Sequence, residues 1–111
     1  MPDHHDANLI VQLAQWSATA GIDEAVSSLF SEDFDADAAK ASDPAVRKAL
    51  QFYETIGTLT KNGLLDQALV LDWLYAKGIW QRVGPAAKRL REEAGVPELY
   101  ENFEALAAAQ E

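Results

Sequence analysis

The chain has 111 residues, of which 49% are hydrophobic and 24% are charged. This composition is too apolar for a disordered chain, and the length suits one domain with a single core, spanning residues 1–111. No apolar run approaches the roughly 18 residues that a bilayer span requires, so we expect no membrane segment. The sequence contains no cysteine, which excludes disulfides and thiolate chemistry and is typical of a cytoplasmic protein.

The charge of the chain is acidic and unevenly distributed. Aspartate and glutamate number 18 against nine lysines and arginines, giving a net charge of −9. Residues 1–45 carry nine acids and one base, residues 46–97 have a net charge of +3, and residues 98–111 carry four acids and no base. Because contacts with phosphates dominate the affinity for nucleic acids, this balance argues against DNA or RNA as a partner.

The N-terminal part predicts two short helices after a flexible terminus at residues 1–5. The apolar stripe of a helix that begins near Asp6 consists of Leu9, Leu13, Trp16 and Ala20. The next apolar set, out of phase with the first, consists of Ile22, Val26, Leu29 and Phe30. The phase jump and Gly21 at the join favour two helices, and a single bent helix is the alternative.

Residues 31–42 are acidic and lack helical periodicity, so we expect a loop anchored by Phe34. Its alternating acids are Asp33, Asp35 and Asp37. This stretch lacks the glycine and the terminal glutamate of a calcium-binding loop. His4 and His5 are adjacent at a chain end and would point in different directions, so we expect no metal site.

The centre of the chain, residues 45–75, predicts a helical hairpin around which the other helices pack. Asp43 and Pro44 suit the N-cap and first position of its first helix. The buried stripe of that helix is expected to contain Val46, Ala49, Leu50, Phe52, Tyr53, Ile56, Gly57 and Leu59. An apolar arc this wide indicates partners on two or more sides, and Gly57 within it indicates close approach by another helix.

The turn of the hairpin is marked by several local signals. Gly63 suits the left-handed position after the first helix, and Leu64 would then pack on Leu59. Asp66 is expected to cap the second helix, where Leu65 contacts Val70.

The remaining chain predicts a kinked helix and a last helix. One stripe, formed by Ile79, Val83, Ala86, Leu90 and Ala94, runs through Gly84 and Pro85 without a change of phase. We therefore expect one helix, kinked at Pro85 and ended by Gly95. Pro97 is expected to open the last helix, with residues 108–111 frayed. The predicted fold is an all-α, single-domain bundle of five to six helices.

Glu54 is the charged residue of greatest interest, because it lies at the edge of the central apolar arc. A carboxylate there is costly unless paired, so we predict an ion pair with Arg89 or Arg91 that ties the central helix to the kinked one. The alternative is a pocket between helices in which Glu54 acts as a general acid or base.

A second group of candidates lies near the second bend of the chain. It consists of the aromatic residues Trp73, Tyr75 and Trp80 and the basic residues Arg82 and Lys88. The aromatic residues suit either the core or a partner-binding surface, and we expect Trp73 and Trp80 to belong mainly to the core. The basic residues on the kinked helix suit an acidic partner or an anionic ligand.

Several of these features together resemble an uncharacterised family of small bacterial helical domains, known only as a domain of unknown function. The similarity lies in Phe52-Tyr53-Glu54-x-Ile56-Gly57, Gly63-Leu64-Leu65-Asp66, Trp80, Pro85, Arg89 to Arg91 and Tyr100-Glu101-Asn102-Phe103-Glu104. It covers residues 46–106. Ile79 stands where family members have an aromatic residue, and the arginine of the pattern matches Arg89 or Arg91. The resemblance implies an all-helical fold and a bacterial origin, but no activity.

The sequence contains no order of residues typical of a catalytic site and no phosphate-binding glycine loop, and we expect no cofactor. We predict a non-enzymatic helical module that binds a protein partner or a second copy of itself. One alternative is a small enzyme or ligand-binding protein with a pocket at Glu54. The other is an acidic mimic of nucleic acid, which would use the negative N-terminal segment.

Overall fold

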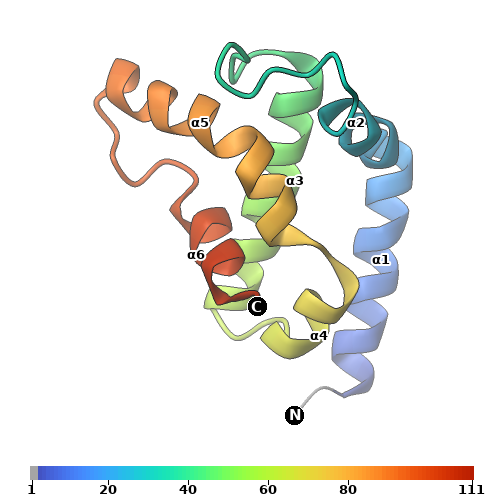
Figure 1. Cartoon of the computed structure of the whole chain (residues 1–111). Helices are drawn as coiled ribbons and strands as arrows, with labels where there is room; N and C mark the ends of the chain where they lie inside the picture. Colours follow the sequence, from blue (N-terminus) through green and yellow to red (C-terminus); the bar gives the residue numbers. More distant parts are fainter. Residues whose placement is uncertain (1–2) are drawn as a thin grey trace.

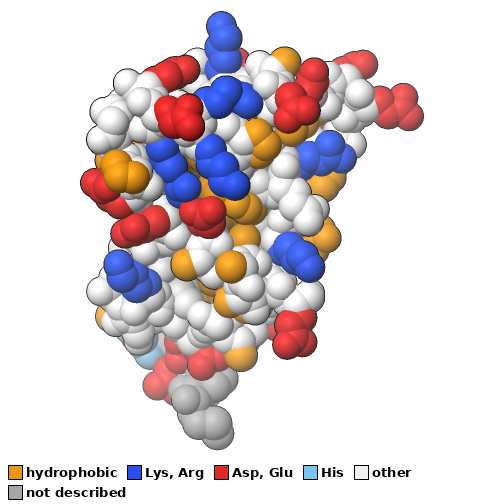
Figure 2. All heavy atoms as spheres, turned by 60° about the vertical axis from the view of Figure 1, so that its left-hand side comes forward, with side chains coloured by type: hydrophobic (Ala, Val, Ile, Leu, Met, Phe, Trp, Pro, Cys, Tyr) orange, Lys and Arg blue, Asp and Glu red, His pale blue; other side chains and the backbone are white. Residues whose placement is uncertain are grey.

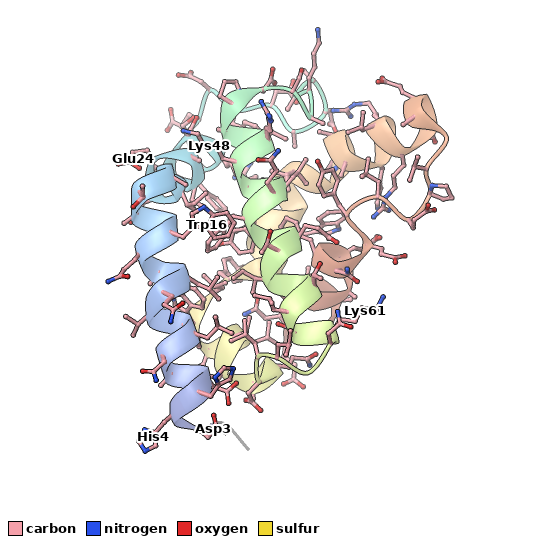
Figure 3. The ribbon with its side chains drawn as sticks, turned by 180° about the vertical axis from the view of Figure 1, so that it is seen from behind. Asp3, His4, Trp16, Glu24, Lys48 and Lys61 are labelled. Carbon is pink, nitrogen blue, oxygen red and sulfur yellow. The ribbon has the colours of Figure 1, made fainter. Side chains whose placement is uncertain are left out.

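Six α-helices surround one core in the structure, a computed structural model that describes residues 3–111 (Figure 1). They are α1 (His4–Ala20), α2 (Ile22–Leu29), α3 (Pro44–Lys61), α4 (Gln67–Trp73), α5 (Ala76–Ala94) and α6 (Glu101–Ala109). Helix α3 runs through the centre, with α1 and α2 on one side and α5 and α6 on the other (Figures 1 and 3). The predicted all-α fold is confirmed. Within residues 3–111, no helix combines the length and apolar character that a bilayer span requires.

The wide apolar face predicted for the central helix is buried. The buried residues of α3 are Val46, Ala49, Leu50, Phe52, Tyr53, Ile56 and Gly57. They face α2 on one side and α5 and α6 on the other. This two-sided contact is the reason that the apolar arc exceeds the single stripe of a surface helix.

The first two helices are separate, as the phase jump predicts. Gly21 ends α1 in the left-handed conformation, with φ of 73°. The start of α1 differs from the prediction, because the helix begins at His4 and is capped by Asp3. The Asp3 carboxylate accepts a hydrogen bond from the Asp6 N–H, and the Asp6 carboxylate accepts one from the Asp3 N–H. Residues 3–5 are thus a helix cap and first turn, whereas the rest of the expected flexible terminus lies outside the described residues.

Asp6 also ties α1 to a distant part of the chain. Its carboxylate accepts a second hydrogen bond, of 3.0 Å, from the N–H of Asp66 at the start of α4. The side chain is buried, and the hydrogen bonds from the Asp3 and Asp66 backbones lower the pKa of the Asp6 carboxyl below its ordinary value.

The turn between α3 and α4 forms as predicted. Gly63 has φ of 74°, the Leu64 N–H donates to Leu59 O at 2.9 Å, and the Gly63 N–H donates to Thr60 O at 3.1 Å. These two bonds define a Schellman motif. The Asp66 carboxylate then caps α4 by accepting a hydrogen bond of 3.0 Å from the Leu69 N–H.

Replacing Gly63 by valine is expected to lower the free energy of unfolding by more than about 1 kcal/mol, since a β-branched residue resists the left-handed conformation. A Cβ atom at Gly63 meets nothing within 4 Å, so the cost is conformational rather than steric. Chemical denaturation measures the effect. Gly63→Asn is the control and should cost less, because asparagine tolerates positive φ; equal losses would contradict this explanation.

The C-terminus is anchored, whereas the sequence predicts fraying at residues 108–111. The Gln110 side chain donates to Leu71 O at 3.0 Å and to Leu74 O at 2.8 Å, and it accepts from the Lys77 N–H at 2.9 Å. One amide thus supplies partners to the end of α4 and the first turn of α5. The prediction failed because these partners lie far away in the sequence, where local patterns carry no signal.

Helix α5 continues through Pro85 as one helix, as predicted, and ends at Gly95 in the left-handed conformation. The last helix begins at Glu101 rather than at Pro97. Its N-cap is Tyr100, with φ of 61°, the one non-glycine residue with positive φ among residues 3–111. Residues 97–100 form turns, and the left-handed Tyr100 separates them from α6, because such a residue cannot continue a right-handed helix.

Candidate functional site

Helix α6 lies unusually close to α3 at Gly57. A Cβ atom at this position would stand 2.6 Å from the carbonyl oxygen of Asn102 and 3.1 Å from the backbone nitrogen of Phe103. Only glycine permits this approach, which explains why a residue of low helix propensity lies in the middle of α3. The close approach predicted for Gly57 is confirmed, and the approaching element is α6.

Glu54, one turn before Gly57, caps α6 instead of binding an arginine. Its carboxylate accepts a hydrogen bond of 2.8 Å from the N–H of Phe103 in the first turn of that helix. This turn contains N–H groups that lack helical partners and carries a partial positive charge, so a half-buried carboxylate is stabilised there. Within residues 3–111 Glu54 forms no ion pair with Arg89 or Arg91, and the predicted pairing is wrong.

Arg91 binds the C-terminal part of the chain. It pairs with Glu104 at 2.9 Å and donates from Nε to Leu99 O at 2.6 Å. Its Nη2 atom is buried without a hydrogen-bond partner among the described residues, but the guanidinium lies 5.7 Å from the ring centre of Trp80. The ring face compensates this buried cation. Arg91 therefore fixes the connection between α5 and α6.

Arg89 points to the opposite side of α5 and holds the long loop before α3. Its guanidinium donates to Ala36 O at 3.3 Å and to Ala39 O. The loop itself was predicted, and Phe34 packs against the core as expected. Glu54, Arg89 and Arg91 thus have three different structural partners.

The candidates near the second bend each meet a different neighbour. Trp73 and Trp80 are half-buried and lie edge-on to Phe52 and Phe103, with ring centres 6.4 and 5.0 Å apart respectively. Tyr75 is 59% exposed, and its ring covers Gly78.

The two basic candidates, Arg82 and Lys88, also have different neighbours. The Arg82 guanidinium lies 5.1 Å from the ring centre of Phe30, whereas Lys88 lines a cavity of about 490 Å³ beside Arg91. None of these contacts contains a set of groups arranged for catalysis.

A cavity of about 520 Å³ lies between the α1–α2 pair and the α3–α4 pair, and Tyr53 lines it. Tyr53 is buried, and this burial raises the pKa of its phenol to about 12, with a smaller contribution from the negative charge of Asp23. The walls combine the aromatic rings of Phe52 and Trp73 with polar side chains, among them that of Asp23.

Replacing Tyr53 by phenylalanine is expected to remove part of the alkaline instability of the protein. The phenol of the unfolded chain ionises near pH 10, and that of the folded chain near pH 12. The contribution of the neutral phenol to stability is therefore complete below pH 10 and is lost as the pH rises to 12. The loss at pH 12 is roughly 2 kcal/mol. Urea denaturation between pH 9 and 12 measures the difference. Tyr75→Phe, at an exposed site, is the matched control, and identical curves for the two variants would contradict the effect of burial.

Helix α1 is poorly covered by the rest of the chain. Only Asp6 and Leu13 of its 17 residues are buried, and Trp16 points toward α3 (Figure 3). Four exposed residues of α1 share helical spacing and are apolar: Ala7, Val11, Ala14 and Ala18. Ala14 and Ala18 also line the cavity beside Tyr53. We call these four residues the outer stripe of α1. This surface was not predicted, although its signal is present in the sequence as a run without charge from residue 7 to residue 22.

The described residues contain no group of three or more His, Asp or Glu side chains that is placed to hold a metal ion. Searches of curated proteins and of solved structures found no match to this chain. A family model with the description "Domain of unknown function (DUF4760)" matches residues 4–110. Because this match includes almost every residue, we conclude that the chain belongs to the DUF4760 family of domains of unknown function.

Proposed function

We propose that this protein is a non-enzymatic interaction module whose contact surface is the outer stripe of α1 and whose partner is a second copy of the chain. The observation that carries the proposal is an exposed, uncharged face on a helix that is poorly covered by its own domain. Val11 is 59% exposed at the centre of this face. The cysteine-free sequence also supports the cytoplasm as the proposed location.

Charge limits where two copies can meet. Each copy has a net charge of −9, so most relative orientations bring like charges together. The run from residue 7 to residue 22 contains no charged side chain. Contact between two α1 helices along this run therefore places no charged side chain at its centre.

The outer stripe is complementary to itself when two α1 helices pack antiparallel. Its spacing of four, three and four residues is that of a helix-packing seam. A two-fold axis between residues 12 and 13 places Ala7 against Ala18 of the second copy, and Val11 against Ala14 of the second copy. Small residues at both ends permit close approach, the larger Val11 faces a small residue, and the two helix dipoles oppose each other favourably.

The contact is modest in size. A helix of 17 residues is about 26 Å long, and a pair of such helices buries less than the roughly 800 Å² per partner of a standard interface. We therefore expect a weak and reversible dimer, whose population depends on protein concentration.

Sedimentation equilibrium from micromolar to millimolar concentration tests the proposal. The parent chain should show a rising mass that approaches that of a dimer. Val11→Glu should remain monomeric, because each interface would contain two buried charges. Gln81→Glu adds the same charge to an exposed position on α5, away from the outer stripe, and it should behave as the parent.

Two results would overturn the proposal. One is a parent chain that stays monomeric at millimolar concentration, which would leave the outer stripe without a second copy. The other is an equal loss of association in both variants, which would show that net charge rather than the outer stripe controls the mass.

A further inference from the structure

A cleft of about 670 Å³ lies between the loop before α3, α3 itself and the second half of α5. Its polar lining consists mainly of Lys40 and Ser42 from the loop, Arg47 and Gln51 from α3, and Arg89 and Glu93 from α5. Tyr100, which precedes α6, adds an aromatic ring. The volume matches that of clefts that bind small molecules.

The charge of this cleft is opposite to that of the protein. Three basic side chains and one acidic side chain line it, in a chain with a net charge of −9. Lys40 and Arg47 are exposed, and within residues 3–111 the one ion pair is Arg91–Glu104, so neither has a carboxylate within salt-bridge distance. Lys and Arg side chains gather in the upper half of the face formed by α5 and α6, with acidic groups around them (Figure 2). Such an arrangement concentrates a positive field where a ligand can reach it.

The contacts that hold the walls of the cleft in place do not neutralise its positive charge. Arg89 fixes the loop through two backbone carbonyls, which neutralise none of its positive charge. The Asp43 carboxylate accepts a hydrogen bond of 2.9 Å from the Lys40 N–H and does not cap α3. The first turn of α3 carries no acidic residue, so its partial positive charge adds to that of the side chains.

The left-handed backbone of Tyr100 ends the connection between α5 and α6 beside this cleft. The ring is half-buried and lines the same space as the three basic side chains. A phenol offers an apolar face and a hydroxyl group that can donate a hydrogen bond to an anion. An organic part of a ligand can therefore contact the ring while its anionic groups meet the cations.

We propose that this cleft binds a small organic molecule that carries two or more negative charges as phosphate or carboxylate groups. Arg47 and Arg89 are the residues suited to planar, two-point contacts with such groups, and Lys40 adds a mobile charge at the entrance. The proposal is independent of the outer stripe of α1, which lies on another helix.

Titration of the full chain with inorganic pyrophosphate and, separately, with citrate tests the proposal by ¹H–¹⁵N chemical shifts at constant ionic strength. At least one probe should give saturable shifts at Lys40, Arg47, Gln51 and Tyr100. Saturation by pyrophosphate alone would identify a phosphate ligand, and saturation by citrate alone a carboxylate ligand. Shifts that stay linear up to 20 mM for both probes would overturn the proposal.

Three variants distinguish specific binding in the cleft from general electrostatic attraction to the protein. Arg47→Gln should weaken binding at least fivefold, and Lys40→Gln at least twofold. Lys61→Gln removes the same charge from an exposed position at the end of α3 and should leave the affinity unchanged. Thermal unfolding checks that all three variants fold, as their exposed positions predict. Equal weakening in all three would show that the probes respond only to net charge.

Discussion

Replacing Gly57 by alanine is expected to lower the free energy of unfolding by roughly 2–3 kcal/mol, although alanine is the better helix former. The added Cβ would stand 2.6 Å from the Asn102 carbonyl oxygen, which belongs to the backbone and cannot rotate away. Helix α6 must move, and its movement would stretch the hydrogen bond between Glu54 and Phe103. Urea denaturation measures the loss.

The same variant has a spectroscopic signature. Trp80 lies 5.0 Å from the ring of Phe103, so displacement of α6 should change tryptophan fluorescence of the folded protein. Gln51→Ala, at an exposed position of α3, is the control and should change neither quantity by much. A Gly57→Ala protein that gains about 1 kcal/mol, the usual advantage of alanine over glycine in a helix, would show that the two helices are not in close contact.

Replacing Glu54 by alanine is expected to cost roughly 2 kcal/mol. The substitution removes the acceptor of the Phe103 N–H and leaves a donor unpaired in the first turn of α6. It also removes a negative charge from the positive end of that helix. Glu54→Gln retains an oxygen acceptor and should cost about half as much. Chemical denaturation of the two variants separates the hydrogen bond from the charge.

A double-mutant cycle distinguishes the cap from an ion pair. Glu54→Ala combined with Arg89→Ala should give additive losses, because these residues have separate partners. A coupling above about 0.5 kcal/mol between Glu54 and Arg89 would restore the ion pair that the sequence predicts.

Local features of the structure were accessible from the sequence because their causes lie within a few residues. Gly63 and Asp66 carry the conformational preference and the capping group that define the turn between α3 and α4. The phase of the apolar stripes separated α1 from α2, since burial on one face of a helix repeats every 3.6 residues. Gly57 also gave a correct prediction, because a buried glycine is costly unless a neighbour needs the space.

Features that join distant parts of the chain were not accessible. Glu54 and Phe103 are 49 residues apart, and Gln110 is 36 residues from Leu74. A carboxylate at the edge of an apolar arc indicates that a partner exists. When this partner is a backbone N–H, no particular residue type marks its position in the sequence. The start of α6 was misplaced for a related reason, because the left-handed conformation of Tyr100 contradicts the intrinsic preference of tyrosine.

The proposed contact surface was not predicted because the larger apolar residues of α1, Leu9, Leu13 and Trp16, define a different stripe of the helix. The outer stripe consists mainly of alanine, which suits exposed and buried helix faces equally. Its significance arises only once the structure shows that α1 forms an edge of the molecule (Figures 1 and 3).

Distances between spin labels on paired α1 helices test the proposed dimer most directly. The chain has no cysteine, so Gln12→Cys and Thr19→Cys each carry one label, at exposed positions beside the outer stripe. Antiparallel pairing about residues 12 and 13 places the two labels at position 12 side by side. It separates those at position 19 by about 20 Å along the helix axis, given a rise of about 1.5 Å per residue. We predict a short distance at position 12 and a clearly longer one at position 19. Equal distances, or no coupling between labels at millimolar concentration, would contradict the account.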